Sequence, residues 1–361
     1  MRLWLAPLFS ITNPDDLPEP LLAAFLSRGE SHLLAVALVA AAAGAMGAFM
    51  LSGRRRRTPG SRGAAAADTR RQLLDSARGE TRDLGQADAL TWLHAHGQSL
   101  AGGDFSRLML DGAGLTSAAL ERAQFSHASL ARADLARADL THADFAAANL
   151  EGANLANARL SAAEMADVRL NRAILTGAEM TDLNAPRLIA IEAKLWDVDL
   201  SCARLEDSVF EHAELTGARL TGADLSRATL AYAACDGTDF QRALMTDAHL
   251  DSAILQKVDF RSAQLDGANL ANADCTHADF SQVHAEGTNF ARAILAQAVL
   301  AGAELANADM NGTDLSLADL SGADLSQVRN LTQDQIAAAC CRADDPPSLP
   351  PGLEPPPAKT D

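Results

Sequence analysis

Large apolar residues recur at every fifth position over more than half of the chain, from Phe105 to Leu325. Of the 45 positions in this span whose number is a multiple of five, 40 carry Leu, Phe or Met. The residue two positions before each of these centres is usually Ala. A helix repeats every 3.6 residues and a strand every two, so neither element alone accounts for a period of five. The exceptions among the centres are Ala185, Ala190, Cys235, Cys275 and Ala285.

A period of five indicates a chain that turns a corner after every five residues, with the large and the small apolar residue of each side pointing inward. Four such sides make a square coil, so each residue lies over the residue twenty positions on, at the spacing of about 4.8 Å between paired strands. Phenylalanine follows this interval of twenty twice, at Phe105, Phe125 and Phe145 and at Phe240, Phe260 and Phe280. The sequence therefore predicts an all-β solenoid with phenylalanines stacked inside it.

The repeat resembles that of the pentapeptide-repeat family, as in the segments ARADLARADL, EGANLANARL, TGADLSRATL and SGADLSQVRN. The resemblance covers residues 101–330 and implies a right-handed quadrilateral β-helix, here of about eleven coils and roughly 54 Å long. One run, TDLNAPRLIAI at 181–191, loses the expected centres and inserts Pro186. We expect there either a tolerated irregularity or a bulge or loop on one corner that could take part in recognition.

The segments that flank the repeat are expected to close its ends, because each coil buries its apolar centres only against its neighbours. Residues 68–100 form a juxtamembrane helical segment, with helices expected at 68–78 and 87–96. Short helices often plug the first coil in the family, and this resemblance implies that residues 87–100 do so, with Trp92 over the open end. Residues 331–361 are expected to form a helical C-cap with contacts from Leu331, Ile336 and Ala339, followed by a proline-rich tail that straps across the last coils or hangs free.

A second strong feature is the uncharged run at residues 33–51, LLAVALVAAAAGAMGAFML. As a helix it would be about 28 Å long, close to the hydrocarbon thickness of a bilayer. Four arginines follow at once, at 54–57 in a basic linker of residues 52–67, whereas residues 1–32 hold more acidic than basic side chains. Because positive charge stays in the cytoplasm, the pattern predicts a single-pass bacterial inner-membrane protein, with a short N-terminal segment outside and the β-helix in the cytoplasm.

Two alternatives to a membrane anchor are a signal peptide and a buried helix. A signal peptide carries its positive charge before the apolar run rather than after it. No globular region of this sequence is suited to bury such a helix. Residues 1–32 are apolar in two short stretches broken by prolines, and we leave open whether they lie at the membrane interface or are disordered.

The sequence offers little for catalysis or metal binding. No two of the six repeat-region histidines differ by a multiple of twenty, so none should stack on one face. Cys235 and Cys275 are inward centres two coils apart, too far for a disulfide, and five cysteines without ligand spacing fit a reducing compartment. Phosphate-loop, nucleophile-elbow and zinc-protease motifs are missing from the sequence. We therefore expect no enzyme activity, no cofactor and no metal site.

Most of the charge is acidic and lies outward. Residues 101–330 hold 33 Asp and Glu against 17 Lys and Arg, a net charge of −16 out of −17 for the chain. Direct nucleic-acid binding is disfavoured, because a phosphate backbone needs a basic stripe. Some members of the family imitate DNA and occupy the DNA-binding saddle of topoisomerases. DNA of the length of this rod carries about 32 charges, twice the net charge found here.

A local acidic feature recurs at intervals of twenty beside one of the phenylalanine ladders. Like charges stacked at about 4.8 Å repel by less than about 1 kcal/mol per pair in water, so a solvated face needs no function to persist. If the rod has a binding edge, we expect a basic partner protein at this Asp stripe. It consists of Asp239, Asp259, Asp279 and Asp319.

The sequence leaves several functions open. The first is a non-catalytic, membrane-tethered scaffold that presents a rigid acidic rod to a protein partner of unknown identity. The second is a DNA-mimicking inhibitor or protector of a type II topoisomerase, which would be a dimer with a continuous acidic face. The third is a delivered effector or part of a secretion apparatus, as some family members are. A homodimer is compatible with each of them.

Overall fold

The computed structural model describes residues 86–358, which belong to two units that divide after Gln98. In the first unit, α4 (Gln86–Ala95) buries Leu90 and Leu93, and the ring of Trp92 stacks on that of His96 at 3.9 Å. The expected helix at 68–78 and the expected membrane span at 33–51 lie outside the described residues. Within 86–358, no helix is both long and apolar enough to cross a membrane. The expected role of residues 87–100 as a plug remains a prediction.

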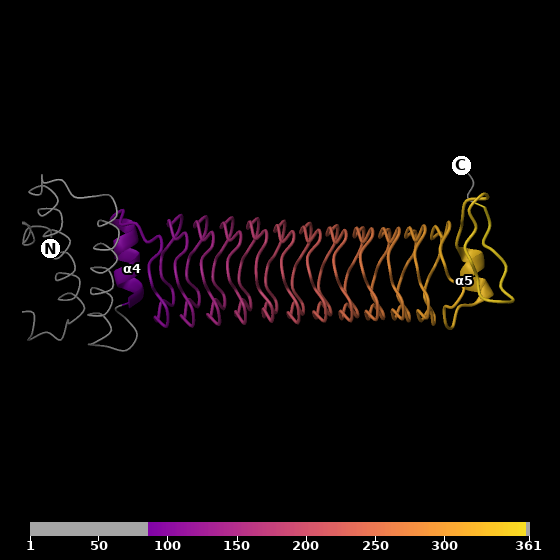
Figure 1. Cartoon of the computed structure of the whole chain (residues 1–361), viewed down its shortest axis with the longest axis horizontal. Coiled ribbons are helices and arrows are strands. Elements are labelled where there is room, and N and C mark those ends of the chain that lie inside the picture. The colour runs from indigo at the N-terminus through magenta and orange to yellow at the C-terminus, as the bar shows by residue number, and fades with distance from the viewer. Residues whose placement is uncertain (1–85, 359–361) are drawn as a thin grey trace, which may run out of the picture. The chain divides into compact units, whose positions relative to one another are not determined.

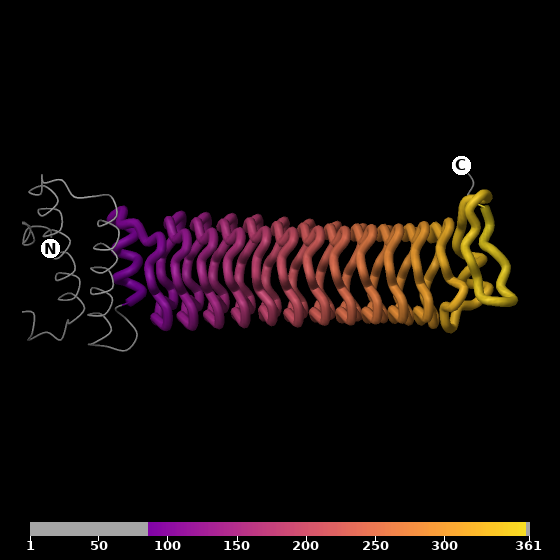
Figure 2. The backbone as a smooth tube through the Cα atoms, viewed as in Figure 1, coloured from indigo at the N-terminus to yellow at the C-terminus, as the bar shows by residue number. Residues whose placement is uncertain are grey.

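The second unit is a four-sided coil that climbs steadily along one axis (Figure 1, Figure 2). It has no extended strands: each side contributes one bridging residue, immediately before the apolar centre. Each bridging residue pairs in parallel with the residue twenty positions on, in an unbroken series from Asp104↔Gln124 to Asp309↔Arg329. The interval of twenty that the phenylalanines suggested is therefore the register of the whole rod.

Backbone hydrogen bonds account for four of the five amides in most pentapeptides of the repeat. In the pentapeptide 113–117, Leu115 N donates to Asp134 O at 2.7 Å, and Ser117 N donates to Ala136 O at 2.7 Å in the next coil. The corner is closed by Ala118 N, which donates to Leu115 O at 3.0 Å. Only the amide directly after the centre has no backbone acceptor in this pattern. Since buried amides need partners, side chains supply the acceptor at many corners.

The Asp or Asn that gives the repeat its signature is this acceptor. Its Oδ1 accepts the amide N–H two residues later, as in Ser226 N to Asp224 at 3.0 Å and Ala271 N to Asn269 at 3.2 Å. Asp and Asn are favoured in turns for this reason. The residue that follows this amide is left-handed, with φ of 54° to 70° at the repeat corners. The acidic residue of the Ala-Asp-Leu unit is therefore first of all a structural residue.

The interior holds one large and one small residue per side. The predicted phenylalanine stacks are present, with ring centroids 5.2 and 4.9 Å apart from Phe105 to Phe145 and 5.3 and 4.9 Å apart from Phe240 to Phe280. Where a hydroxyl replaces the small alanine, it is satisfied by a carbonyl of the preceding coil, as Thr238 Oγ1 is by Leu215 O at 2.8 Å. Each of these buried hydroxyls therefore has a hydrogen-bond partner.

The run 181–191 forms no bulge or loop, so of the two alternatives the structure shows the tolerated irregularity. Asn184 and Ile189 keep the register of twenty in both directions. In these two pentapeptides the large and small positions are exchanged, so that Leu183 and Leu188 are buried beside the small centres Ala185 and Ala190. Pro186 occupies the corner position whose amide the ladder does not use, and proline is favoured at the second residue of such turns. The volume of the core and the backbone ladder are therefore both preserved, whereas Asn184 Oδ1, which has no corner amide to accept, is buried without a hydrogen-bond partner among the described residues.

The far end of the rod is covered by α5 (Gln333–Ala338) and the tail. Thr332 caps α5 in a reciprocal capping box with Gln335, and Ile336 is fully buried. Gln335 Nε2 also donates to Met310 O and Thr313 O of the preceding coils, both at 2.8 Å. Ser348 pairs with Asp324 and Ala358 with Cys341, so the proline-rich tail lies across the end of the rod up to residue 358.

The exchange of positions can be tested by mutation. Leu183→Ala should leave a cavity beside Ala185 and destabilise the protein by about 2–5 kcal/mol. The double variant Leu183→Ala/Ala185→Leu restores the usual order of large centre and small neighbour and should recover most of this loss. The measurement is the free energy of unfolding in denaturant, with Leu317→Ala, at an exposed corner, as a near-neutral control. Equal stability of the single and double variants would contradict the exchange.

The carboxylates at the corners predict a loss of stability in acid. Hydrogen bonds from the Ser326 hydroxyl and amide hold the pKa of Asp324 below its ordinary value. At Asp274, burial raises the pKa, but hydrogen bonds from Thr276 and Gln256 outweigh it and lower the pKa. The pKa of Asp309 is lowered mainly by a hydrogen bond from Asn330. Each group contributes stability above the ordinary aspartate pKa of about 3.9 and loses it as the pH falls through the folded value.

We therefore expect the thermal unfolding midpoint to be constant at neutral pH and to fall below about pH 4. Asn keeps the acceptor oxygen and does not titrate, so the triple variant Asp274→Asn/Asp309→Asn/Asp324→Asn should show a shallower fall. Circular dichroism of both proteins against pH makes the comparison. The same slope in the two proteins would mean that these three carboxylates do not contribute.

Candidate interaction surface

The four sides of the coil give the rod four faces, which we name after their first centres as the Phe105, Leu110, Leu115 and Leu120 faces. Each face comprises the pentapeptides centred on that residue and on every twentieth residue after it. On each face the bridging residue and the two corner residues that follow the centre point outward. These outward columns are the surface that a partner would meet.

The structure places the Asp stripe on the Leu120 face. Asp259 pairs with Asp239 in the coil before it and with Asp279 in the coil after it, so these three residues are adjacent. Val299 lies between Asp279 and Asp319 and interrupts the stripe. The sequence reasoning therefore located the column correctly, and whether a partner binds there remains a prediction.

The carboxylates of the Asp stripe are already engaged within the chain. Asp239 accepts the Gln241 amide and the Thr221 hydroxyl, both at 2.9 Å. Arg261 donates to Asp259 at 2.6 Å and lies 3.7 Å from Asp279. Burial raises the pKa of Asp259, but hydrogen bonds from Arg261 and Gln241 outweigh it and hold the pKa below its ordinary value. One arginine therefore partly neutralises the middle of the stripe.

The acidic charge is spread unevenly over the four faces. Within residues 101–330, the Phe105 face carries twelve acidic and four basic residues, and the Leu120 face nine and five. The Leu110 face carries six and five, and the Leu115 face six and three. Half of the net negative charge therefore lies on the Phe105 face rather than on the face of the Asp stripe.

One corner of the Phe105 face alternates in charge along the rod. Arg187 binds Asp167 through two hydrogen bonds of 2.7 Å, and Arg227 binds Asp207 through two of 2.7 and 2.8 Å. These bonds lower the pKa of both aspartates. The pairs are exposed, so they contribute little stability, but they remove part of the negative field from this face.

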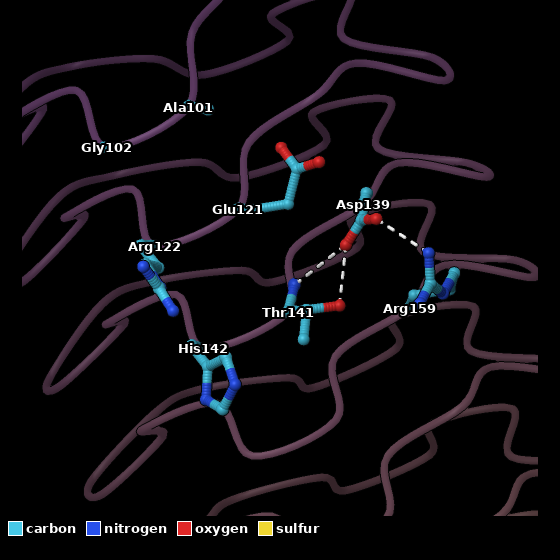
Figure 3. Close-up of a pocket in the computed structure, with 8 residues that line it drawn as sticks. All are labelled: Ala101, Gly102, Glu121, Arg122, Asp139, Thr141, His142 and Arg159. Carbon is cyan, nitrogen blue, oxygen red and sulfur yellow. Dashed lines mark hydrogen bonds and ion pairs between the residues drawn. The ribbon is translucent and has the colours of Figure 1, made fainter. Parts of the chain in front are cut away.

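A shallow hollow of about 570 Å³ lies where the first coils of the Leu120 face turn their corner (Figure 3). Figure 3 shows Glu121 and Asp139 on one side of it and Arg122 and His142 on the other. Asp139 accepts the Thr141 hydroxyl at 2.6 Å and is paired with Arg159 at 2.7 Å. Since the Thr141 hydroxyl donates to a carboxylate that an arginine neutralises, this arrangement does not activate a nucleophile.

The histidines and cysteines of the repeat are spread along the rod rather than gathered at one place. Within residues 86–358, no three His, Cys, Asp or Glu side chains are placed to hold a metal ion. His212 stacks on Tyr232 at 5.0 Å, and His284 contacts Glu304 at 2.9 Å. Cys235 and Cys275 are fully buried free thiols, and burial raises their pKa well above the ordinary range. They are core residues rather than nucleophiles.

The sequence reasoning missed a grouping of apolar residues on the outside of the rod. Among the described residues, seven large hydrophobic side chains are exposed, and five of them lie on the Leu115 face. The signal was available in the numbering, because Ile174, Ile254 and Ile294 differ by multiples of twenty. The five residues are Ile174, Trp196, Ile254, Ile294 and Leu317.

Comparison with known proteins supports the family. The family model described as pentapeptide repeats matches eight copies, over residues 118–155, 153–185, 191–227, 223–261, 259–300 and 293–329. No curated protein matches the chain significantly. Similar solved structures include HetL, a pentapeptide repeat protein involved in heterocyst differentiation regulation from the cyanobacterium Nostoc sp. strain PCC 7120. It is 30% identical, over 67% of this chain and 97% of that chain, with a TM-score of 0.48.

Two further solved structures are more distant. A pentapeptide repeat protein from the Arabidopsis thaliana thylakoid lumen is 29% identical over 28% of this chain and 69% of its own, with a TM-score of 0.23. Full-length QnrB1, a plasmid-mediated fluoroquinolone resistance protein, is 18% identical over 46% of this chain and 86% of its own, with a TM-score of 0.24. Because the family model alone spans more than half of the sequence, the chain belongs to the pentapeptide-repeat family, whose members fold as right-handed quadrilateral β-helices.

Proposed function

We propose that this protein is a non-catalytic scaffold that residues 33–51 tether to the bacterial inner membrane, with the β-helix on the cytoplasmic side. Its task is to present a long, rigid surface to another protein. The proposal combines the charge pattern around the apolar run with the geometry of the repeat.

The observation that carries the proposal is the unbroken register of twenty from Asp104 to Arg329. Every outward side chain belongs to a column whose spacing is set by backbone hydrogen bonds rather than by flexible loops. A surface of this kind loses little conformational freedom when it binds, so more of the contact energy remains as affinity. A partner can be recognised over several coils at once.

The chemistry of the described residues fits this function. The hollow at the Leu120 face holds no activated nucleophile, and the buried thiols are protonated. Several surface arginines form ion pairs with carboxylates of the rod itself. The remaining surface charge is therefore patterned rather than uniform. Such patterns give selectivity between protein partners more than they give affinity.

A second candidate is an inhibitor that competes with DNA on a topoisomerase. The observation that favours it is the concentration of acidic residues on the Phe105 face. The alternation of Asp167, Arg187, Asp207 and Arg227 along that face weakens the resemblance to a phosphate backbone, whose charge has one sign throughout. The two candidates differ in whether the anchor is needed.

In-cell crosslinking followed by affinity capture should distinguish them. We expect the intact chain to capture a membrane protein that a variant lacking residues 1–60 does not, because the anchor places the rod beside its partner. A topoisomerase captured equally by both forms would overturn the scaffold in favour of DNA mimicry. Capture of secretion components would instead assign the protein to that apparatus.

The role of the Asp stripe can be tested without disturbing the fold. The triple variant Asp239→Asn/Asp259→Asn/Asp279→Asn keeps the oxygen that accepts the corner amide and removes three charges. If a basic partner binds this face, its capture should fall about tenfold, since several close ion pairs are lost together. The matched control is Asp104→Asn/Asp144→Asn/Asp224→Asn on the Phe105 face, which makes the same change at equivalent corners. An equal effect of both variants would exclude the stripe as a specific site.

A further inference from the structure

The Leu115 face differs from the other three faces in two independent ways. It carries the fewest charged residues of the four within 101–330, nine in all, and most of the exposed large hydrophobic side chains. Ile174, Ile254 and Ile294 are 39%, 44% and 40% exposed in one column, and Trp196 is 39% exposed at the adjacent corner. Exposed apolar residues gathered on one side of a soluble rod mark an interaction surface.

The second difference concerns ion pairs. In the part of the chain that the structure describes, the Phe105, Leu110 and Leu120 faces each hold at least one ion pair, and the Leu115 face holds none. Lys194 lies over the ring of Trp196, 5.4 Å from its centroid, instead of beside a carboxylate. Asp274 accepts hydrogen bonds from Thr276 and Gln256 but no cation contacts it. The charges of this face are therefore available to another molecule.

We propose that the Leu115 face binds a second copy of the chain, in antiparallel orientation, about a two-fold axis that passes between the two rods at the level of Ala234. Such an axis lies in the plane between the two faces and at right angles to the rods. It reverses the order of the coils but keeps each column opposite itself. A residue then faces the residue of the same column in the other copy that lies the same number of coils from Ala234 on the opposite side.

This register makes the face complementary to itself. Lys194 and Asp274 are each forty positions from residue 234 and lie opposite one another, so every dimer contains this pair twice. Ile174 lies opposite Ile294, and Ala234 opposite its own copy, which allows close approach at the axis. At the corner, Asp197 lies opposite His277.

The remaining coils complete the pattern. The coil that carries Glu214 lies opposite the coil that carries Ile254 and Lys257. Along the rod, the long side chain of Lys257 is therefore less than the height of one coil from the Glu214 carboxylate of the other copy. Asp236 meets its own copy, but at a corner, where solvent screens the repulsion. The contact from coil 174 to coil 294 is about 30 Å long at the spacing of the coils.

Other arrangements of the same face are worse. A shift of one coil in either direction separates Lys194 from Asp274. Asp274 then lies opposite Glu214 or Ile174, and Lys194 lies opposite an isoleucine in both cases, so no opposite charges meet in the column. A parallel pair would set Lys194 against Lys194 and Asp274 against Asp274. Because like charges in contact suppress a pairing, the sequence of this column specifies one register and one orientation.

Charge reversal of the central pair tests the proposal. The full chain is co-expressed with two different tags, captured through one tag and quantified through the other. Lys194→Glu or Asp274→Lys alone opposes like charges twice per dimer and should lower the recovery of the second tag about tenfold. The double variant Lys194→Glu/Asp274→Lys exchanges the two charges and should restore recovery. Arg242→Glu, at the corner between the Leu120 and Phe105 faces and therefore away from the Leu115 face, makes the same charge change as Lys194→Glu and should leave recovery unchanged.

Two further measurements separate association from folding. The thermal unfolding of each purified variant shows whether Asp274→Lys has damaged the corner at Thr276, and Asp274→Asn keeps that corner while it removes the charge. Asp274→Asn should lower recovery by less than the reversal does. No loss of recovery in either single reversal, or no rescue in the double variant, would overturn the antiparallel dimer. That holds also if the two copies associate through the membrane anchor or the ends of the rods, because the reversals would then leave recovery unchanged. Loss of the membrane partner without loss of self-association would affect the scaffold proposal alone.

Discussion

The hydrogen-bond ladder between successive coils is the constraint on which the rest of the structure depends. Three of the five amides in each pentapeptide donate to the neighbouring coils and a fourth closes the corner. An insertion or deletion of one residue would rotate every later side chain from the inside of the rod to its outside, as a register slip does in a sheet. The chain therefore keeps twenty residues per coil even where its sequence departs from the repeat.

The fifth amide explains the polar part of the motif. Because the ladder does not use this amide, its partner must be a side chain or water. Pro186 has no N–H at this position and needs no acceptor. An aspartate or asparagine before the centre reaches it at about 3 Å at corner after corner. Many of the acidic residues of this rod are thus explained by the corners, and net charge alone is weak grounds for assigning them a binding role.

The residues that determine function are those outward residues that neither the ladder nor the corner amides require, and these differ from column to column. On three faces some of the remaining charges pair with a residue of an adjacent coil, as Arg172 does with Glu192, Arg187 with Asp167 and Arg219 with Asp199. On the Leu115 face they do not, and isoleucines take their place. A stacked fold brings residues that are scattered over about 140 positions of sequence onto one surface. The outward residues of a column can therefore change, and with them the choice of partner, without altering the core.

The sequence by itself determined the fold class, the interval of twenty, the phenylalanine stacks and the position of the Asp stripe. It could do so because the repeat is local: each side of the coil is decided by five consecutive residues. The sequence left the run around Leu183 and Ala185 open between an irregularity and a loop, because a pattern of centres does not show that the neighbouring inward position can take the large side chain. Only the tertiary structure decided which carboxylates are occupied by corner amides or arginines and which face lacks ion pairs. Those properties depend on side-chain contacts between residues two, eighteen or twenty apart, whose geometry the order of residues along the chain does not state.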